Sequence, residues 1–364
     1  MRLALSLDAC RQRQARLCER LTAEKLDAAL LMDLRHIYYL SGFWRVGRVL
    51  TPAALLLRAD GSSALVAPAP VEETPAADRV ATYEADRLAT LIDDFHAELF
   101  QSLQPHLQGI QRLGTDGVPR SLPLEGAESR AITPLLRALR RTKDPDEVAM
   151  LQRAVEGAEA AYARAKAMLE PRITEVQLYA GMLSAAIEAL GEPLTEFGND
   201  FQCNAAGGPP RDRPVQTGEL AIFDLGVVYR AYSSDLSRTF VVGRQPSEAQ
   251  QAAYQRILEA FAYIESAIRP GTSCKAVYAE VHRMLDGHRG WSFPHHLGHG
   301  IGLSAHEAPR LNPNWDDTFQ IGDVFTAEPG LYGDDLRAGI RIEQNYLVTP
   351  TGLQRLSHFP TDLA

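Results

Sequence analysis

Cysteines and long apolar runs are both scarce in this chain of 364 residues. The four cysteines are Cys10, Cys18, Cys203 and Cys274, and none belongs to a CxxC pair. Their scatter argues against a disulfide framework and favours buried free thiols in a reducing compartment. No stretch approaches the roughly 20 apolar residues of a membrane-spanning helix, and the first apolar run is too short for a signal peptide. We therefore expect a cytoplasmic protein.

Basic charge is scarce relative to acidic charge. Lys and Arg number 37 against 46 Asp and Glu, which gives a formal net charge of −9. This sign disfavours a nucleic acid, which binds a basic face, and an anionic membrane surface. Apolar residues make up 45% of the chain and charged residues 23%, as in an ordinary globular protein. We expect neither a nucleic-acid partner nor a membrane partner.

Several catalytic motifs are absent from the sequence. There is no GxSxG elbow of a serine hydrolase and no P-loop. The pair His306-Glu307 is followed by APR, so it does not form the HExxH motif of many zinc proteases. The glycines of GHGIG follow Pro-His-His instead of a strand, which argues against a dinucleotide-binding loop.

The length allows about two domains, because single hydrophobic cores stop growing near roughly 250–300 residues. Residues 1–125 alternate between strand-type and helix-type segments, which predicts an α/β domain. Residues 126–364 begin with long helix-type segments and end in strands and loops. The expected helices span 8–24, 88–103, 145–169, 174–190, 247–268 and 274–285.

Two acids lie in the segment 220–243, where apolar and β-branched runs flank a short polar middle, as in a β-hairpin. With a turn centred on Tyr229-Arg230, Asp224 and Asp235 lie opposite each other, with Cβ atoms roughly 4.5–5.5 Å apart. Two carboxylates so placed repel each other, so we expect a cation between them. The alternative is that one acid belongs to the turn and the other is solvated.

Six of the ten histidines lie between His282 and His306. Three of them, His295, His299 and His306, stand in an apolar, glycine-rich stretch whose glycines let the backbone bend and approach closely. A lone histidine there is typical of a satisfied core residue. A cluster of this density favours a metal site or a catalytic role.

Two glutamates, Glu328 and Glu343, lie symmetrically about a connection near Asp335-Leu336. Glu343 stands in an apolar strand, where an unpaired acid is costly to bury. One interpretation is a structural pair with Arg341, two positions away on the same face. The other is that both glutamates join the two aspartates.

Four carboxylates and one imidazole carry too much negative charge for one divalent ion, but they suit two. Two metals ~3.5–4 Å apart can share a water, lower its pKa and polarise a carbonyl or phosphoryl oxygen. Oxygen-rich ligation with a single histidine indicates Mn, Co, Fe or Zn, with Mn favoured by the hard oxygens.

From about Arg141 onward, the motifs resemble those of the pita-bread metallopeptidases, which include Xaa-Pro dipeptidase (prolidase), aminopeptidase P and methionine aminopeptidase. FDLG with SDLSRTF, HxxxHGIGLxxHE, EPGLY and GIRIE occur in family order and spacing. Residues 1–125 look like the creatinase-type N-terminal domain of the first two, which methionine aminopeptidase lacks. The resemblance implies an α+β pita-bread catalytic domain over 126–364 and, commonly in this branch, a homodimer.

The resemblance also implies roles for individual residues. Asp235 and Glu343 match ligands that bridge both metals, and Glu328 matches a ligand suited to moving the proton of the attacking water. His295 and His306 match histidines that contact the substrate and steady the tetrahedral intermediate, and Arg341 matches an arginine just outside the ligand set. The implied metal ligands are Asp224, Asp235, His299, Glu328 and Glu343.

One further match concerns substrate length. Arg310 matches an arginine suited to holding the C-terminal carboxylate of a dipeptide, which a charged fork recognises well. The alternative for Arg310 is a surface salt bridge. This residue and the short chain favour a dipeptidase over aminopeptidase P.

The chain also departs from the family pattern. The family usually has a substrate-binding histidine about seventeen residues before the first metal aspartate, where this chain has Gly207. Gln344 and His296 replace a common Asp and a frequent Gly. The implied function is dinuclear-metal hydrolysis of the peptide bond before proline, foremost in Xaa-Pro dipeptides. The alternatives are aminopeptidase P, a creatinase-like hydrolase of a non-peptide C–N bond, and a non-catalytic peptide-binding relative.

Overall fold

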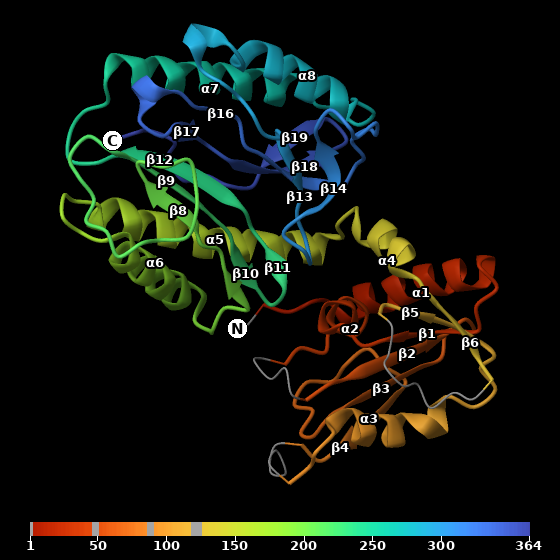
Figure 1. Cartoon of the computed structure of the whole chain (residues 1–364). Helices are drawn as coiled ribbons and strands as arrows, with labels where there is room; N and C mark the ends of the chain where they lie inside the picture. Colours follow the sequence, from red (N-terminus) through yellow and green to blue (C-terminus); the bar gives the residue numbers. More distant parts are fainter. Residues whose placement is uncertain (1–2, 46–50, 86–90, 118–125) are drawn as a thin grey trace. The chain divides into compact units, whose positions relative to one another are not determined.

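The computed structural model describes residues 3–45, 51–85, 91–117 and 126–364. The chain forms two compact units, Met1–Arg140 and Arg141–Ala364 (Figure 1). The boundary expected after residue 125 adjoins the segment 118–125, which lies outside the described residues, and it stays a prediction. Each unit is described by itself.

The N-terminal unit contains a six-stranded mixed sheet with the order β4-β3-β2-β1-β5-β6. Helices α1 and α3 lie on opposite faces of this sheet (Figure 1). Apolar side chains of α3, such as Leu99 and Leu103, pack with Leu30 and Leu56 of the central strands. This arrangement confirms the α/β class expected for the first part of the chain. The elements are α1 (Leu7–Ala23), β1 (Ala28–Leu31), α2 (Leu34–Ser41), β2 (Ala54–Arg58), β3 (Ser63–Pro68), β4 (Arg79–Tyr83), α3 (Phe95–Leu103), η2 (Gln104–His106), β5 (Arg112–Thr115), β6 (Glu128–Ala131) and α4 (Thr133–Arg140).

One helix of this unit is shorter than the sequence pattern suggested. The helix expected over 88–103 begins only at Phe95. Asp94 precedes it with extended backbone and accepts hydrogen bonds from the backbone N–H groups of His96 and Ala97, which is how a helix N-terminus is capped. Residues 86–90 lie outside the described residues.

The C-terminal unit has its strands between two helix pairs, α5 with α6 and α7 with α8 (Figure 1). Its larger sheet has the order β14-β13-β15-β18-β19, and a smaller one has the order β12-β9-β8. The helices are α5 (Pro145–Met168), α6 (Glu175–Leu190), α7 (Glu248–Ala267), α8 (Cys274–Leu285), η3 (His288–Gly290) and η4 (Asp334–Leu336). The strands are β7 (Glu196–Phe197), β8 (Asp200–Cys203), β9 (Leu220–Leu225), β10 (Val227–Tyr229), β11 (Tyr232–Ser233), β12 (Leu236–Val241), β13 (Gly298–Gly300), β14 (Glu307–Leu311), β15 (Val324–Ala327), β16 (Gly330–Leu331), β17 (Ile340–Arg341), β18 (Gln344–Thr349) and β19 (Gly352–Arg355).

The helices of this unit begin and end where their sequence signals lie. Thr174 and Gln177 form a reciprocal capping box at the start of α6, and Ser247 and Gln250 form another at the start of α7. Gly191 ends α6 in the left-handed conformation, with φ of 71°. The helices expected over 145–169, 174–190, 247–268 and 274–285 are therefore confirmed within one or two residues.

The hairpin of residues 220–243 forms, but its predicted register is wrong. Asp224 pairs with Ser237 across the β9–β12 ladder instead of with Asp235. The turn lies at Arg230-Ala231, one residue later than expected, and both residues have positive φ, 45° and 66°. Such a two-residue turn matches strand twist but usually takes Asn or Gly, so the sequence carries no signal for its position. Asp235 still lies two positions from Ser237, diagonally across from Asp224.

The second hairpin has the predicted register. The pairs Ala327↔Gln344 and Gly330↔Arg341 lie on either side of Glu328 and Glu343, so the two glutamates are opposed as expected. The segment 194–218, which has GGPP near its centre, contains the strands β7 and β8. β8 adds to the edge of β9 and places Asp200 beside Asp224 in the ladder.

Two further expectations concern cysteines and membrane spans. All four cysteines are free and buried, as predicted. Among the residues that the structure describes, no helix combines the length and apolar character needed to cross a bilayer.

Candidate active site

Three acids from two hairpins meet in the C-terminal unit. Asp224 lies near the end of β9, Asp235 lies between β11 and β12, and Glu343 lies between β17 and β18. Carboxylate oxygens of the three lie within 4.8 Å of one another. Glu328, just after β15, is buried opposite Glu343. The fold thus brings together the four acids that the sequence singled out.

The electrostatics of this cluster disfavour four ionised acids. Burial raises the pKa of Asp224 to about 7, with Arg341 opposing the shift and Glu328 adding to it. Burial raises the pKa of Asp235 and of Glu343 well above their usual range, and neighbouring carboxylates add to both shifts. Oε2 of Glu343 is buried and has no hydrogen-bond partner among the described residues. The cluster carries more negative charge than its protein neighbours offset.

Histidines complete one side of the cluster. Nε2 of His299 lies 3.8 Å from Oδ2 of Asp235 and 3.7 Å from Oε1 of Glu328. Nδ1 of His299 lies 3.2 Å from the carbonyl oxygen of Gly300, an acceptor that requires the ring proton on Nδ1. Burial lowers the pKa of His299 to about 4, so the ring is neutral and its Nε2 lone pair faces the acids. This is the form in which an imidazole binds a metal.

The backbone of β13 explains how His299 reaches this position. A Cβ atom on Gly300 would lie 2.0 Å from the carbonyl oxygen of Ala308, and one on Gly298 would lie 2.0 Å from that of Thr326. The two glycines therefore let β13 pass closely between β14 and β15. The close approach places the histidine between them against the acids.

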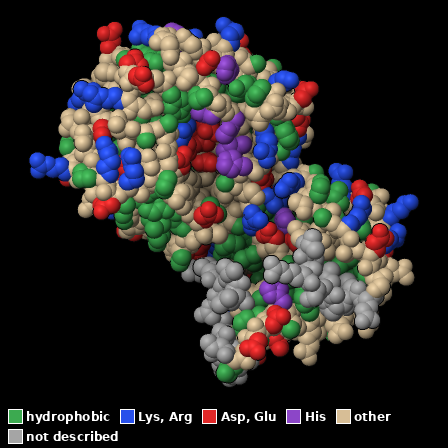
Figure 2. Space-filling view, in the orientation of Figure 1, with side chains coloured by type: hydrophobic (Ala, Val, Ile, Leu, Met, Phe, Trp, Pro, Cys, Tyr) green, Lys and Arg blue, Asp and Glu red, His purple; other side chains and the backbone are tan. Residues whose placement is uncertain are grey.

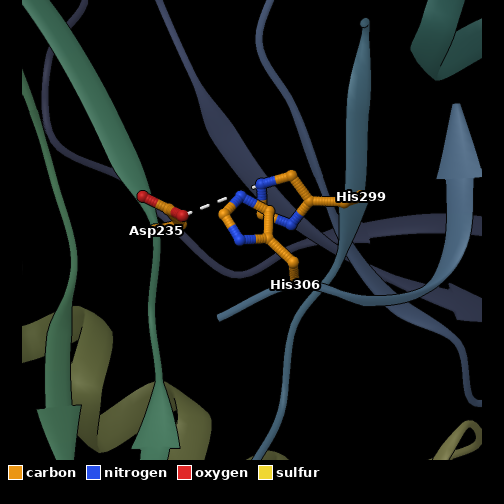
Figure 3. A group of neighbouring side chains, drawn as sticks. All are labelled: Asp235, His299 and His306. Atoms are coloured by element: carbon orange, nitrogen blue, oxygen red, sulfur yellow. Dashed lines mark ion pairs between the residues drawn. The ribbon is translucent and has the colours of Figure 1, made fainter. Parts of the chain in front are cut away.

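His306 lies beside His299, with ring centroids 3.9 Å apart. Figure 3 shows both rings next to the carboxylate of Asp235, and the three residues can offer ligand atoms within 4.8 Å of one another. In the space-filling view of this unit, acidic and histidine side chains gather side by side in a hollow of the surface (Figure 2). The imidazoles thus line one side of the acidic cluster, where His306 is exposed and His299 is buried.

His295 points to a different set of partners. Its Nε2 lies 3.0 Å from the hydroxyl of Tyr332, and its Nδ1 lies 2.8 Å from the carbonyl oxygen of His296. The same hydroxyl accepts a hydrogen bond from Nη1 of Arg341 at 2.9 Å. His295 therefore belongs to a chain of polar contacts beside the acids.

The cation that faces Asp224 is Arg341. Its Nε lies 2.6 Å from Oδ2 of Asp224, and its Nη2 lies 3.1 Å from Oδ2 of Asp200. The alternative pairing of Arg341 with Glu343 is not found in the C-terminal unit. Arg341 therefore lies between Asp224 and Asp200, and the cation expected between Asp224 and Asp235 stays a prediction.

Sequence reasoning missed three residues of this site, Asp200, His296 and Tyr332. The register of β8 against β9 identifies Asp200, but the Gly- and Pro-containing segment around β8 hid that strand. His296 was visible in the histidine cluster, and its Nε2 lies 2.9 Å from Oε1 of Glu328. Its pKa is raised, chiefly by this hydrogen bond. Tyr332 gave no signal beyond its place in EPGLY.

The position of Gly207 is close to Asp200. A Cβ atom built on Gly207 would lie 2.8 Å from Oδ1 of Asp200. The Asp200 carboxylate therefore occupies the space where a side chain at 207 would begin. Any side chain at position 207 would displace this acid.

Two further features lie near the cluster. A cavity of about 710 Å³ has Tyr332, Glu219 and Arg337 among its lining residues; Tyr332 contacts His295, but none of the clustered acids and histidines lines this cavity. Arg310 is exposed on β14, directly across the ladder from His299. Cavities of roughly 300–1,000 Å³ are typical of small-ligand sites.

Known families match both parts of the chain. The profile of metallopeptidase family M24 matches residues 149–350, and that of the creatinase/prolidase N-terminal domain matches residues 13–155. An uncharacterized peptidase of Staphylococcus aureus (strain USA300) is 29% identical over 354 residues, which cover 95% of this chain and 98% of the relative.

Solved structures agree with this match. The prolidase from Pyrococcus horikoshii OT3 superposes with a TM-score of 0.79 at 24% identity, covering 97% of this chain and all of that one (100%). The dipeptidase PepE from Mycobacterium ulcerans superposes with a TM-score of 0.75 at 26% identity, covering 99% of this chain and 98% of that one. The two-domain architecture, creatinase-type followed by pita-bread, is that of these proteins.

Proposed function

The chain belongs to metallopeptidase family M24, and from that premise we propose that it is a dinuclear-metal Xaa-Pro dipeptidase. The observation that carries the proposal is the buried cluster of Asp224, Asp235 and Glu343, whose oxygens lie within 4.8 Å of one another without enough positive charge to offset them. The similarity to a prolidase and to a dipeptidase supports this class of substrate.

The donor set fits a pair of divalent ions. Oxygen ligands from four acids and the neutral Nε2 of His299 suit such ions, and the buried Oε2 of Glu343 would gain a partner. When bound, two such ions lower the pKa of a shared water and polarise the scissile carbonyl. Manganese is our first assignment because most donors are hard oxygens, with cobalt, zinc and iron as alternatives. The residues proposed to hold the ions are Asp224, Asp235, His299, Glu328 and Glu343.

The remaining residues would act on protons and on the substrate. Glu328 would take the proton of the attacking water and deliver it to the leaving nitrogen. His306 would donate a hydrogen bond where negative charge develops on the carbonyl oxygen. His295 is held between Tyr332 and a backbone carbonyl, so we assign it to the wall against which the substrate lies. Arg341 would hold Asp224 in place through its 2.6 Å contact.

Arg310 would limit the length of the substrate. Its exposed side chain on β14, across from His299, can pair with the C-terminal carboxylate of a dipeptide. A longer peptide has no carboxylate at this place. This is the reason for ranking a dipeptidase above aminopeptidase P.

A second candidate is hydrolysis of a non-peptide C–N bond in a creatinase-like compound. It is favoured by the acid Asp200 in the space beside Gly207, because an acid there suits a cationic group of the substrate. Arg341 neutralises part of this charge through its 3.1 Å contact with Asp200. The two candidates therefore differ in the charge of the substrate group that would lie beside Asp200 and Gly207.

Two further assignments accompany the proposal. A homodimer is supported by the creatinase-type domain at residues 13–155, since relatives of this build commonly pair. A cytoplasmic location is supported by the four buried free cysteines, which suit a reducing compartment.

The test is a substrate panel with Mn²⁺, Co²⁺ and Zn²⁺ each supplied to the metal-free protein. We expect hydrolysis of Xaa-Pro dipeptides and little activity on longer Xaa-Pro peptides or on creatine-like compounds. Turnover of only the longer peptides would identify an aminopeptidase P activity. Turnover of only the creatine-like compounds would replace the first candidate with the second.

A further inference from the structure

His296 lies at the edge of the acidic cluster, and the function proposed above gives it no role. Its Nε2 is 2.9 Å from Oε1 of Glu328, and its ring centroid is 5.6 Å from that of His299. His296, His299 and Glu328 can each offer a ligand atom within 4.8 Å of the others. A second imidazole thus faces the same carboxylate as His299.

The distances suit ligands of one ion. Two atoms bound at 2.0–2.2 Å to one ion, at tetrahedral or octahedral angles, are ~2.8–3.6 Å apart. Oε1 of Glu328 lies 2.9 Å from Nε2 of His296 and 3.7 Å from Nε2 of His299. Oε1 of Glu328 therefore lies at or near the spacing of a shared ion from both imidazole nitrogens, and ligand atoms of all three residues lie within 4.8 Å of one another.

The other part of the cluster is chemically different. Asp224, Asp235 and Glu343 can offer three ligand atoms within 4.8 Å of one another, and all three are carboxylate oxygens. Hard oxygens suit Mn²⁺, whereas imidazoles suit Zn²⁺, Co²⁺ and related ions. The cluster thus has an oxygen side and an imidazole side, and the two sides favour different ions.

We propose that His296 is a metal ligand of this chain, so that the position built on His299 and Glu328 carries two imidazoles and selects Zn²⁺ or Co²⁺ over Mn²⁺. The inference rests on the metal-dependent function proposed above and adds to its ligand set. The oxygen-lined position keeps its preference for Mn²⁺. The chain would therefore hold two unlike metals when both are supplied.

The simpler alternative is that His296 only donates a hydrogen bond to Glu328 and positions it. The side chain of His296 is 42% exposed, against 9% for Glu328. A residue that only positions Glu328 would affect the binding of every ion that Glu328 holds, to a similar degree. A ligand would affect Zn²⁺ and Co²⁺ more than Mn²⁺, and this difference separates the two roles.

The test compares His296→Gln with His288→Gln, which removes an exposed imidazole from η3, outside the cluster. Affinities of the metal-free proteins for Zn²⁺ and for Mn²⁺ are measured by chelator competition, and the visible absorption of the Co²⁺ form is recorded. We expect His296→Gln to weaken the tighter Zn²⁺ site by at least about tenfold while Mn²⁺ affinity changes less than about threefold. The Co²⁺ spectrum should change, and His288→Gln should match the wild type.

Other outcomes overturn the inference. An unchanged ratio of Zn²⁺ to Mn²⁺ affinity, with an unchanged Co²⁺ spectrum, would exclude His296 as a ligand. Equal weakening of the binding of both ions would leave His296 as a positioning residue for Glu328.

If the wild-type chain binds neither ion, the proposed function itself fails. If it binds two ions and His296→Gln has no effect, only this inference fails. Thermal unfolding of the metal-free variant checks that it folds, which its exposed position favours.

Discussion

The N-terminal unit buries a cluster of charged side chains that balance one another, whereas the C-terminal unit buries a cluster that does not balance. In the first, Oδ2 of Asp116 lies 2.9 Å from Nδ1 of His36, and Nε2 of His36 lies 2.9 Å from Nη1 of Arg140. Asp116 also accepts backbone N–H bonds from Met32 and Asp33. Asp116, His36 and Arg140 are thus joined in one chain of polar contacts, in which a single acid lies with a histidine and an arginine.

In the second cluster, four acids face one another with Arg341 as their main cation. The pKa of Asp224 is raised to about 7 by burial, with the neighbouring acids adding to the shift. A folded chain retains such an arrangement when something outside the chain offsets it. Buried acids with partners of suitable charge serve stability, whereas buried acids in excess indicate a site for cations.

We expect the largest effect from a substitution in the acidic cluster of the C-terminal unit. Asp235 can offer a ligand atom both to the group of Asp224 and Glu343 and to the group of His299 and His306. If it is the metal ligand that we propose, Asp235→Asn should lower the proposed dipeptidase activity by about 10⁴-fold or more. The measurement is kcat/KM on an Xaa-Pro dipeptide with saturating Mn²⁺. Activity that survives this change in the metal-loaded protein would contradict the assignment.

The matched change in the first cluster should act on stability alone. Asp116→Asn leaves His36 and Arg140 buried without their acid, which should lower the free energy of unfolding by about 3–5 kcal/mol. Urea unfolding of the metal-free protein measures the loss. The metal affinity of the folded variant should equal that of the wild type, and a changed affinity would show that the two clusters are not independent.

The contrast between the clusters could be predicted only in part from the sequence. Glu328 and Glu343 were placed opposite each other because their hairpin has symmetric strands. The helices were predicted well because capping residues such as Thr174 and Gly191 act locally.

Other parts of the site depend on contacts that no local pattern encodes. The register at Asp224 failed because the turn at Arg230-Ala231 adopts positive φ without Gly or Asn. The pairing of β8 with β9 places Asp200 beside Asp224, and no local pattern predicts that pairing. The contacts of Arg341 with these two acids therefore could not be predicted either. The balanced cluster of His36 and Asp116 joins residues 80 positions apart, and no pattern in the sequence announced it.

Added Mn²⁺ should supply the positive charge that the acidic cluster of the C-terminal unit lacks. Mn²⁺ at about 100 times its dissociation constant should stabilise the wild-type chain by about 2.7 kcal/mol, because the ion binds the folded state alone. Asp235→Asn should gain little, and Asp116→Asn should gain as much as the wild type. Thermal unfolding with and without Mn²⁺ measures the gain. Equal stabilisation of all three proteins would indicate binding elsewhere.

The smallest effect concerns a balanced acid within the C-terminal unit. Glu175 is buried and accepts hydrogen bonds from the backbone of Cys203 and from Arg211, at 3.0 Å and 2.9 Å. Burial is the largest single influence and would raise its pKa, but the hydrogen bonds from Arg211 and Cys203 and the charge of Arg211 together outweigh burial and lower it. Glu175→Gln should therefore cost about 1.5 kcal/mol at pH 7.

The pH dependence of the stability difference between wild type and Glu175→Gln shows whether the charge of Glu175 causes that difference. Because the folded-state pKa lies below the ordinary 4.5, the stabilisation is present above that pH and is lost as the pH falls through the folded-state value. The difference between wild type and Glu175→Gln should shrink below pH ~4. A difference that is constant with pH would mean that charge is not its source.

The acids of the C-terminal unit form an unbalanced cluster, and we propose that this cluster binds divalent cations. Calorimetric titration of the metal-free chain, with elemental analysis of the product, tests this binding. We predict two divalent ions per chain and release of protons on binding, because acids with raised pKa values must ionise to become ligands. A chain that binds no ion in stoichiometric amount, or that binds as well after Asp235→Asn, would contradict the account.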